Sequence, residues 1–367
     1  NQVVEVVMIM TDPSKNYYDY QGFKFVVNTP AYANLDTNDF KTTITSIGRI
    51  GFNDYEDNPP TQGIGASYQT NALLYEAGFM LGASTSKVSD CVRANAGTGT
   101  YDNEFKSIQG ARYLKPGLKD MEIYSLYNDS SAPVATVLGM QIEQRSYAWK
   151  NTTDNNFVIL EYKITNKSSI TYDSIFPGIF TDWDVYNYAY NRADWDSIHK
   201  MAYTYCTIGG TKVVGVSLLT NNIPSCFSMD QSSVGGNNIN PNDPANGFTT
   251  LDKFTTLANG VYRKQAGMAG FGNDVSQVTG AKITNFAPGD VETVAFALIG
   301  ADNIIALSDA AQTARDKFVS IHQGPVPIAP DVTICRKDTL NITFTPTNGN
   351  KFAFFSSPPP AAPLYVG

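Results

Sequence analysis

The chain has 367 residues, of which 42% are hydrophobic and only 16% charged, and a formal net charge of −8 without any cluster of Lys or Arg. Nucleic-acid binding needs a basic patch, so this class of function is excluded. The sequence contains no run of about 18 apolar residues, so we expect no transmembrane segment. Its polarity comes from Asn, Thr, Ser and Gly rather than from Lys and Glu, so we expect a location outside the cell or on the outer cell surface.

Strand patterns dominate the predicted elements in chain order. An opening strand covers 1–10, more strand candidates follow up to 149, and 157–184 reads as two successive strands that we interpret as a sandwich hairpin. Pro177 and Gly178 favour an edge or a bulge for its second strand. Strands also cover 189–220 and 282–300, and a single amphipathic helix lies within 302–322. We therefore predict a mainly all-β fold, an antiparallel β-sandwich with one helix.

The predicted domain organisation has three parts. Residues 1–324 form a β-sandwich region, either one sandwich or two packed sandwiches split near 135–140. Residues 325–331 form a Pro-rich linker. Residues 332–367 begin an immunoglobulin-like domain, but hold about three strands where a complete domain needs about seven.

The four cysteines lack zinc-binding spacing. Cys206 and Cys226 are near each other in sequence and flank adjacent predicted strands, so we predict a disulfide between them. Cys335 is expected to lack its partner, and the pairing of Cys91 stays open. The alternative is that the cysteines are buried free thiols.

Several blocks of the chain carry a resemblance, namely SIGRIGFND, LLYEAGFMLGASTSKVSDCVR, SYAWKNTTDNNFVILEYKITN, GIFTDWDVYNYAYNRADWD and APGDVETVAFALIGADNI. They resemble a β-rich region of surface and secreted Bacteroidota proteins, many of them type IX secretion cargo, in which this region at times follows a subtilisin-like protease domain. The segment 332–367 resembles the start of an immunoglobulin-like module. The resemblance implies O-glycosylation at Ser174, Ser197 and Thr339, which stand in Asp-Ser/Thr-hydrophobic triplets; the alternative is that they are turn residues.

The densest polar segment is TDWDVYNYAYNRADWD. Carboxylates two positions apart on a loop can converge on a hard cation, so we predict a calcium site and no other cofactor. The predicted ligands are Asp182, Asp184, Asn191, Asp194 and Asp196. The alternative is a set of turn-capping carboxylates that pair with Arg192.

The aromatic residues of the same segment form a predicted ligand platform. Their rings would stack on a sugar, or else pack across strands. The platform residues are Trp183, Tyr186, Tyr188 and Trp195.

No catalytic signature is present: the chain has no G-x-S-x-G elbow and only two histidines, His199 and His322. We therefore predict that the protein is not an enzyme but an extracellular structural or adhesion protein, with other surface proteins or glycans as partners. Two alternatives stay open. The chain is an accessory substrate- or glycan-binding region of a surface subtilisin-like protease, or it is a polymer subunit that self-associates by adding strand 2–10 to a neighbour's sheet.

Overall fold

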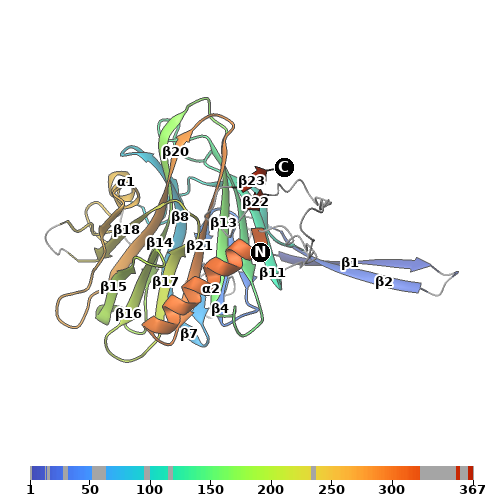
Figure 1. Cartoon of the computed structure of the whole chain (residues 1–367), viewed down its shortest axis with the longest axis horizontal. Helices are drawn as coiled ribbons and strands as arrows, with labels where there is room; N and C mark the ends of the chain where they lie inside the picture. The colour runs from blue at the N-terminus through green and yellow to red at the C-terminus, as the bar shows by residue number, and fades with distance from the viewer. Residues whose placement is uncertain are drawn as a thin grey trace, which may run out of the picture. The chain divides into compact units, whose positions relative to one another are not determined.

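Two large β-sheets dominate the fold of this chain, seen here in a computed structural model (Figure 1). The chain divides into two compact units, Asn1–Arg315 and Asp316–Gly367, and both sheets belong to the first. The structure describes residues 2–12, 14, 17–27, 32–51, 63–94, 100–114, 119–232, 237–322, 353–355 and 363–366.

The first sheet has eight antiparallel strands in the order β10-β11-β12-β13-β21-β17-β16-β15. Strands β10 to β13 follow one another along the chain, and β15 to β17 do the same at the other edge. The strands are β10 (Lys106–Leu114), β11 (Met121–Asn128), β12 (Met140–Ala148), β13 (Phe157–Asn166), β15 (Asn191–Asp196), β16 (Met201–Cys206), β17 (Val213–Leu218) and β21 (Val291–Ala301).

The second sheet has eleven strands, with the order β19-β18-β20-β14-β8-β5-β4-β6-β7, while β3 pairs with β4 and β9 with β8. All its pairs are antiparallel except β18 with β19. Both sheets combine strands from before and after residues 135–140. The strands are β3 (Tyr32–Leu35), β4 (Phe40–Thr45), β5 (Arg49–Ile50), β6 (Ala66–Tyr68), β7 (Asn71–Ala72), β8 (Leu74–Ser84), β9 (Lys87–Asp90), β14 (Tyr172–Trp183), β18 (Ile223–Asp230), β19 (Val261–Arg263) and β20 (Val275–Phe286).

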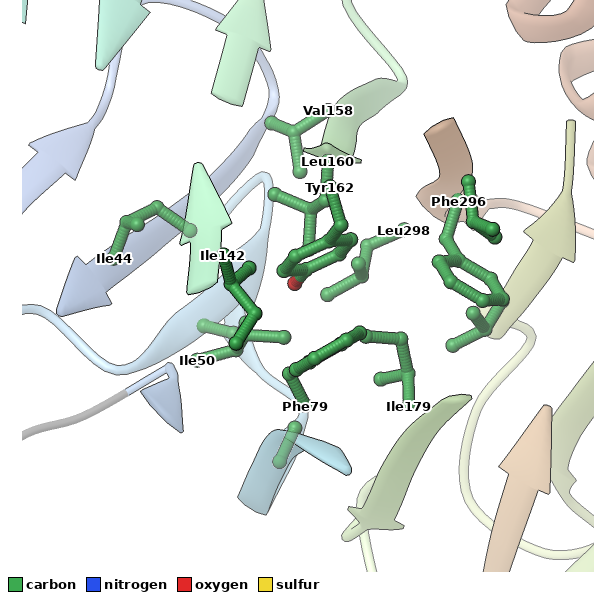
Figure 2. Close-up of a cluster of buried hydrophobic side chains, with 14 of the residues drawn as sticks. Ile44, Ile50, Phe79, Ile142, Val158, Leu160, Tyr162, Ile179, Phe296 and Leu298 are labelled. Atoms are coloured by element: carbon green, nitrogen blue, oxygen red, sulfur yellow. The ribbon is translucent and has the colours of Figure 1, made fainter. Parts of the chain in front are cut away.

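The hydrophobic core lies between the two sheets (Figure 2). Phe79 on β8 stacks on Tyr162 of β13, with ring centroids 4.2 Å apart, and Tyr162 meets Phe296 of β21 edge-on. These fully buried side chains come from facing strands of the two sheets, so truncating one of them to alanine is expected to cost about 3–5 kcal/mol. The predicted all-β sandwich is confirmed.

The predicted hairpin 157–184 is wrong, although both of its strands exist. β13 pairs with β12 and β21 in the first sheet, whereas β14 pairs with β20 and β8 in the second, so the connection crosses the sandwich. The predicted edge position of β14 is also wrong, because the strand lies in the interior of its sheet. Pro177, which has no N–H to donate, falls where the pairing with β20 is interrupted, between Ile175 and Gly178.

Two α-helices occur in the described residues where the sequence predicted one. The predicted helix is α2 (Ile304–His322), and its first half buries Leu307 and Ala311. The second helix, α1 (Thr250–Ala258), was missed; it begins at a capping box formed by Thr249 and Asp252.

Helix α1 packs on a patch of the second sheet that has no side chains. We call this patch the glycine socket, and it consists of Gly82 of β8, Gly178 of β14 and Gly280 of β20. A Cβ atom at Gly178 would lie 2.5 Å from Leu257 Cδ2 of α1, and one at Gly82 would lie 3.2 Å from Leu257 Cδ1. The absence of side chains on three neighbouring strands therefore makes room for the helix.

Short elements complete the description. β1 (Gln2–Asp12) pairs with β2 (Tyr17–Val27) of the same chain, and in the second unit β22 (Ala353–Phe355) pairs with β23 (Pro363–Val366). A 3-10 helix η1 spans Tyr188–Tyr190. The predicted linker 325–331 lies outside the described residues, as does most of the predicted immunoglobulin-like segment 332–367. Among the described helices, none has the length and apolar character needed to cross a membrane.

Candidate acidic site at four strand ends

Four neighbouring strands of the second sheet end at one place and bring together acidic residues from distant parts of the sequence. Asp182, near the end of β14, pairs with Glu76 of β8 on one side and with Ser276 of β20 on the other. Asp274 directly precedes β20, and Gln231 directly follows β18. We call Asp182, Asp184 and Asp274 the acidic centre.

The three carboxylates of the acidic centre are close together: one oxygen from each lies within 4.8 Å of the others. Asp182 is buried and the other two are half-buried. Asp182 Oδ2 accepts a hydrogen bond from Arg93 Nη2 at 2.5 Å, and its Oδ1 accepts one from Gln231 Nε2. Gln231 Nε2 also donates to Asp274 Oδ1 at 3.0 Å. Within the described part of the chain, the carboxylate of Asp184 accepts no hydrogen bond.

Arg93 is the cation of this site, and it is only 1% exposed. Its Nε lies 3.2 Å from Glu76 Oε2, and its Nη1 donates to the side-chain oxygens of Gln231 and Asn242. Glu76 Oε1 is buried and has no hydrogen-bond partner in the described residues. Two carboxyl groups therefore pair with the guanidinium, and Asp184 and Asp274 add further carboxyl groups close by.

The excess of carboxylates alters their protonation. Burial, and then the charge of Asp182, raises the pKa of Asp184 to about 7. Burial and the charges of Asp182 and Asp184 raise the pKa of Asp274 to about 7, although Arg93 opposes the change at both residues. Protons or another positive charge must compensate the acidic centre near neutral pH.

Only two of the five predicted calcium ligands, Asp182 and Asp184, reach the acidic centre. The side chain of Asn191 is buried and binds the backbone N and O of Val185. Asp194 accepts from Gln265, and Asp196 Oδ2 lies 2.6 Å from His199 Nδ1. These three residues stand on β15 of the other sheet, where local partners hold their side chains.

The predicted aromatic platform is not assembled. Trp183 is fully buried in the core and offers no face to a ligand, because it follows Asp182 on a strand inside the sandwich. Tyr186 and Tyr188 are 41% and 54% exposed, and Trp195 is half-buried on β15. The ring of Tyr186 rests on Gly210 instead of standing free.

The predicted disulfide between Cys206 and Cys226 is wrong, because both are buried free thiols. Cys206 ends β16 in the first sheet and Cys226 lies on β18 in the second. Cys206 Sγ donates to Ile208 O at 2.9 Å. Cys91 is free as well, and Cys335 lies outside the described residues.

The predicted glycosylation residues differ in accessibility. Ser174 is half-buried on β14 and its hydroxyl donates to Asp173 O, whereas Ser197 is exposed in the turn between β15 and β16. Thr339 lies outside the described residues. Glycosylation at these residues stays a prediction.

Asp274, Glu76, Arg93 and Gln231 were missed from the sequence. One signal was present: Glu76 interrupts the apolar run LLYEAGFML, and a charged residue inside a buried strand needs a partner. Asp274 and Gln231 gave no comparable signal, because they stand in polar connections that only the strand order brings together.

No protein-family model matches the sequence, and no curated protein matches it. Among solved structures, the chain is similar to a bacterial glucoamylase complexed with acarbose, with 12% identity, a TM-score of 0.44, and coverage of 86% of this chain and 38% of that one. It is also similar to heparan sulfate lyase HepC from Pedobacter heparinus (8% identity, TM-score 0.37, 75% and 36% covered) and to Pichia pastoris lysyl oxidase (5% identity, TM-score 0.40, 74% and 52% covered). The chain thus spans about a third to a half of the length of these proteins.

These structures are enzymes, whereas the sequence alone predicted that the protein is not an enzyme and that it is a non-catalytic structural, adhesion, accessory or polymer-forming protein. Those predictions are withdrawn. They relied on the absence of a linear catalytic motif, but a search for linear motifs does not detect carboxyl groups that come together from three separate strand ends. At these identities the likeness concerns the fold alone and assigns no activity.

Proposed function

We propose that the acidic centre binds a divalent cation, Ca²⁺, and that the protein is a calcium-binding β-sandwich protein. The observation that carries this proposal is the convergence of Asp182, Asp184 and Asp274 within 4.8 Å, with Arg93 as the nearby cation. The carboxylate of Asp184, half-buried and without a hydrogen bond among the described residues, supplies a free ligand oxygen.

The ligand chemistry supports a hard cation. The groups at the acidic centre are carboxylates, with the amides of Gln231 and Asn242 around Arg93, and no His or Cys belongs to the group. Zn²⁺ prefers nitrogen and sulfur ligands, whereas Ca²⁺ takes six to eight oxygens in irregular arrangements. Mg²⁺ demands a near-ideal octahedron, which irregular strand ends are poorly suited to provide.

Isothermal titration of the chelator-treated protein with Ca²⁺ tests the proposal. We expect saturable binding of one ion per chain, which Asp184→Asn and Asp274→Asn each weaken at least about tenfold, since each removes a charged oxygen ligand. Asp194→Asn is the matched control, because Asp194 belongs to the same acidic segment but not to the acidic centre. The calcium affinity of this variant should equal that of the unmodified protein. Equal loss in all three variants, or no binding by the unmodified protein, rejects the site.

A second candidate function is general acid–base chemistry at the same carboxyl groups. It is favoured by the pKa of about 7 at both Asp184 and Asp274, because a group that titrates near the working pH transfers protons most effectively. A panel of chromogenic glycosides and esters tests it in the presence of chelator. Turnover that Asp184→Asn abolishes and Asp194→Asn preserves supports this function, and absence of turnover across the panel counts against it.

We also propose that the protein works outside the cell or on its surface. The low charged fraction of 16% and the resemblance to exported Bacteroidota proteins support this location. Fractionation of the source cells tests it, and a cytoplasmic pool alone would reject it. Mass spectrometry of the same material tests O-glycosylation at Ser174, Ser197 and Thr339.

A further inference from the structure

A cavity of about 540 Å³ lies on the first sheet, where the first turn of α2 faces the ends of β16 and β17. It shares no residue with the acidic centre. Most of its lining is apolar, and the residues used below are Tyr205, Thr211, Val213, Asn303, Ile304 and Ile305. Cavities of roughly 300–1,000 Å³ with mostly apolar walls are typical of small-molecule sites.

The cavity is open because the first turn of α2 presents apolar side chains that the described residues leave exposed. Ile304 is 42% exposed and Ile305 is 77% exposed. The turn is held firmly, since Asn303 Oδ1 accepts from Ala306 N at 2.9 Å and Asn303 O accepts from Leu307 N at 3.0 Å. The two isoleucines are therefore fixed in an exposed position by the helix cap.

The opposite wall includes Gly210, which follows Gly209 in the same loop. Gly210 lines the cavity, and a Cβ atom there would lie 2.0 Å from the ring of Tyr186, so only glycine allows this loop to pass the ring. Gly209 has a φ of +101°, a conformation that side chains rarely adopt. Tyr205 adds a flat, half-buried ring, which stacks on Tyr203 with centroids 6.2 Å apart.

Charge at the cavity is balanced. Lys212 Nζ pairs with Asp302 Oδ1, also donates to Gln69 Oε1 at 2.6 Å, and lies over the ring of Tyr68. The side-chain oxygen of Asn303 is used in the helix cap. Because the ionic groups compensate each other, a charged ligand would lose its hydration without gaining a partner.

We propose that this cavity binds an uncharged small molecule with a flat, apolar face, which would lie between the ring of Tyr205 and the side chains of Ile304 and Ile305. The Thr211 hydroxyl is at hand to orient a polar substituent. The site is independent of the calcium proposal, since the two groups of residues stand on different sheets.

Titration with the neutral dye Nile red, whose fluorescence rises in apolar surroundings, tests the proposal on the full chain. We expect saturable enhancement with one dye per chain. Ile304→Asp, which puts a charge on the apolar wall, and Thr211→Trp, which fills the cavity, should each weaken binding at least about tenfold. Both residues are exposed, so the variants are expected to keep the melting temperature of the unmodified protein.

Two controls make the outcome decisive. Ile198→Asp changes an isoleucine that is 81% exposed but does not line the cavity, and it should leave Nile red binding unchanged. The anionic dye anilinonaphthalene sulfonate should bind at least about tenfold more weakly than Nile red, because none of the described residues that line the cavity is a cation. No saturable enhancement, equal binding by Ile304→Asp, or tighter binding of the anionic dye would overturn the proposal.

Discussion

Two buried cations, Arg93 and Lys253, each lie among carboxyl groups, and each residue is only 1% exposed. Lys253, on α1, uses all three of its ammonium protons. Its Nζ lies 2.8 and 2.9 Å from the two oxygens of Asp90 and 2.6 Å from Asp102 Oδ2. Asp90 Oδ1 also accepts from Val92 N, so local groups satisfy this ion pair completely.

The third carboxyl group near Lys253 is neutralised locally as well. Burial, and then the charge of Asp90, raises the pKa of Glu104 to about 8, and Glu104 Oε2 accepts from Asp90 N at 3.1 Å. The Arg93 site differs, because Asp184 and Glu76 Oε1 keep unused oxygens within the described residues. The number of carboxylates therefore does not distinguish the two sites, whereas the carboxylate oxygens left without partners do.

The largest effect should come from removing Lys253, the cation of the group that it forms with Asp90, Asp102 and Glu104, which we call the closed site. Lys253→Met leaves Asp90 buried without a counter-charge, and the free energy of unfolding should fall by about 3–5 kcal/mol in urea denaturation. Lys163→Met, at an exposed lysine on β13, is the control and should change stability by less than about 0.5 kcal/mol. A loss below about 1 kcal/mol for Lys253→Met would show that the ion pair does not hold α1 to the sheet.

The second effect separates the two sites by their response to calcium. Ca²⁺ at a hundredfold excess over Kd should raise the free energy of unfolding by about 2.7 kcal/mol, because it binds only the folded state. Asp274→Asn should remove this increase, whereas Asp102→Asn, at the closed site, should keep it. Equal stability in calcium and in chelator would show that protons, and not a bound cation, compensate the charge of the acidic centre.

The third effect is a change of stability with pH. The pKa of Asp184 is raised to about 7 in the folded state, from about 3.9 in an unfolded chain. Between about pH 4 and pH 7 the folded state therefore holds a proton that the unfolded state has released, and the free energy of unfolding falls as pH rises. The free energy of unfolding, measured by urea denaturation at several pH values in this range, should depend less steeply on pH in Asp184→Asn.

The same measurement can be repeated at the closed site. The pKa of Glu104 is raised to about 8, so Glu104→Gln should reduce the fall in the free energy of unfolding mainly near pH 8. With calcium present, the free energy of unfolding should rise with pH in every variant that keeps the acidic centre, since ion binding requires ionised carboxylates. A decline with pH that neither variant changes would contradict these pKa assignments.

The smallest effect concerns the cap of the helix that carries Lys253. Thr249→Ala removes the hydrogen bond that the threonine side chain accepts from Asp252 N at 3.1 Å, and should cost about 1 kcal/mol. Thr255→Ala, within the same helix, should cost less than about 0.5 kcal/mol. Thermal unfolding distinguishes the two, and equal shifts would mean that the capping box contributes nothing.

Sequence patterns predicted the strands better than their partners. The two strands within 157–184 and the position of α2 were predicted correctly, because alternation and helical periodicity are local signals. The assignment of β13 and β14 to one hairpin failed, because alternation does not reveal which sheet a strand joins. Helix α1 was missed because it is short and its buried face includes Lys253 and Thr256, which look like surface residues until Asp90 is placed beside them.

Only part of the acidic centre was predicted from the sequence. Asp182 and Asp184 stood out by charge density, but the same criterion also selected Asp194 and Asp196, which lie on the other sheet. Asp274 could be recognised only from the order of strands β18, β20, β14 and β8, which depends on long-range pairing. The sequence therefore indicated the chemistry of the site but not which residues form it.

The glycine socket has a consequence for the order of folding. Gly82, Gly178 and Gly280 come from strands far apart in sequence, so the surface that receives Leu257 does not exist until β8, β14 and β20 have aligned. Docking of α1 is then a late step, and we expect the interactions of Leu257 to be absent from the folding transition state. In refolding experiments the helix would act as a reporter of sheet closure, and shortening Leu257 should accelerate unfolding while leaving the folding rate nearly unchanged.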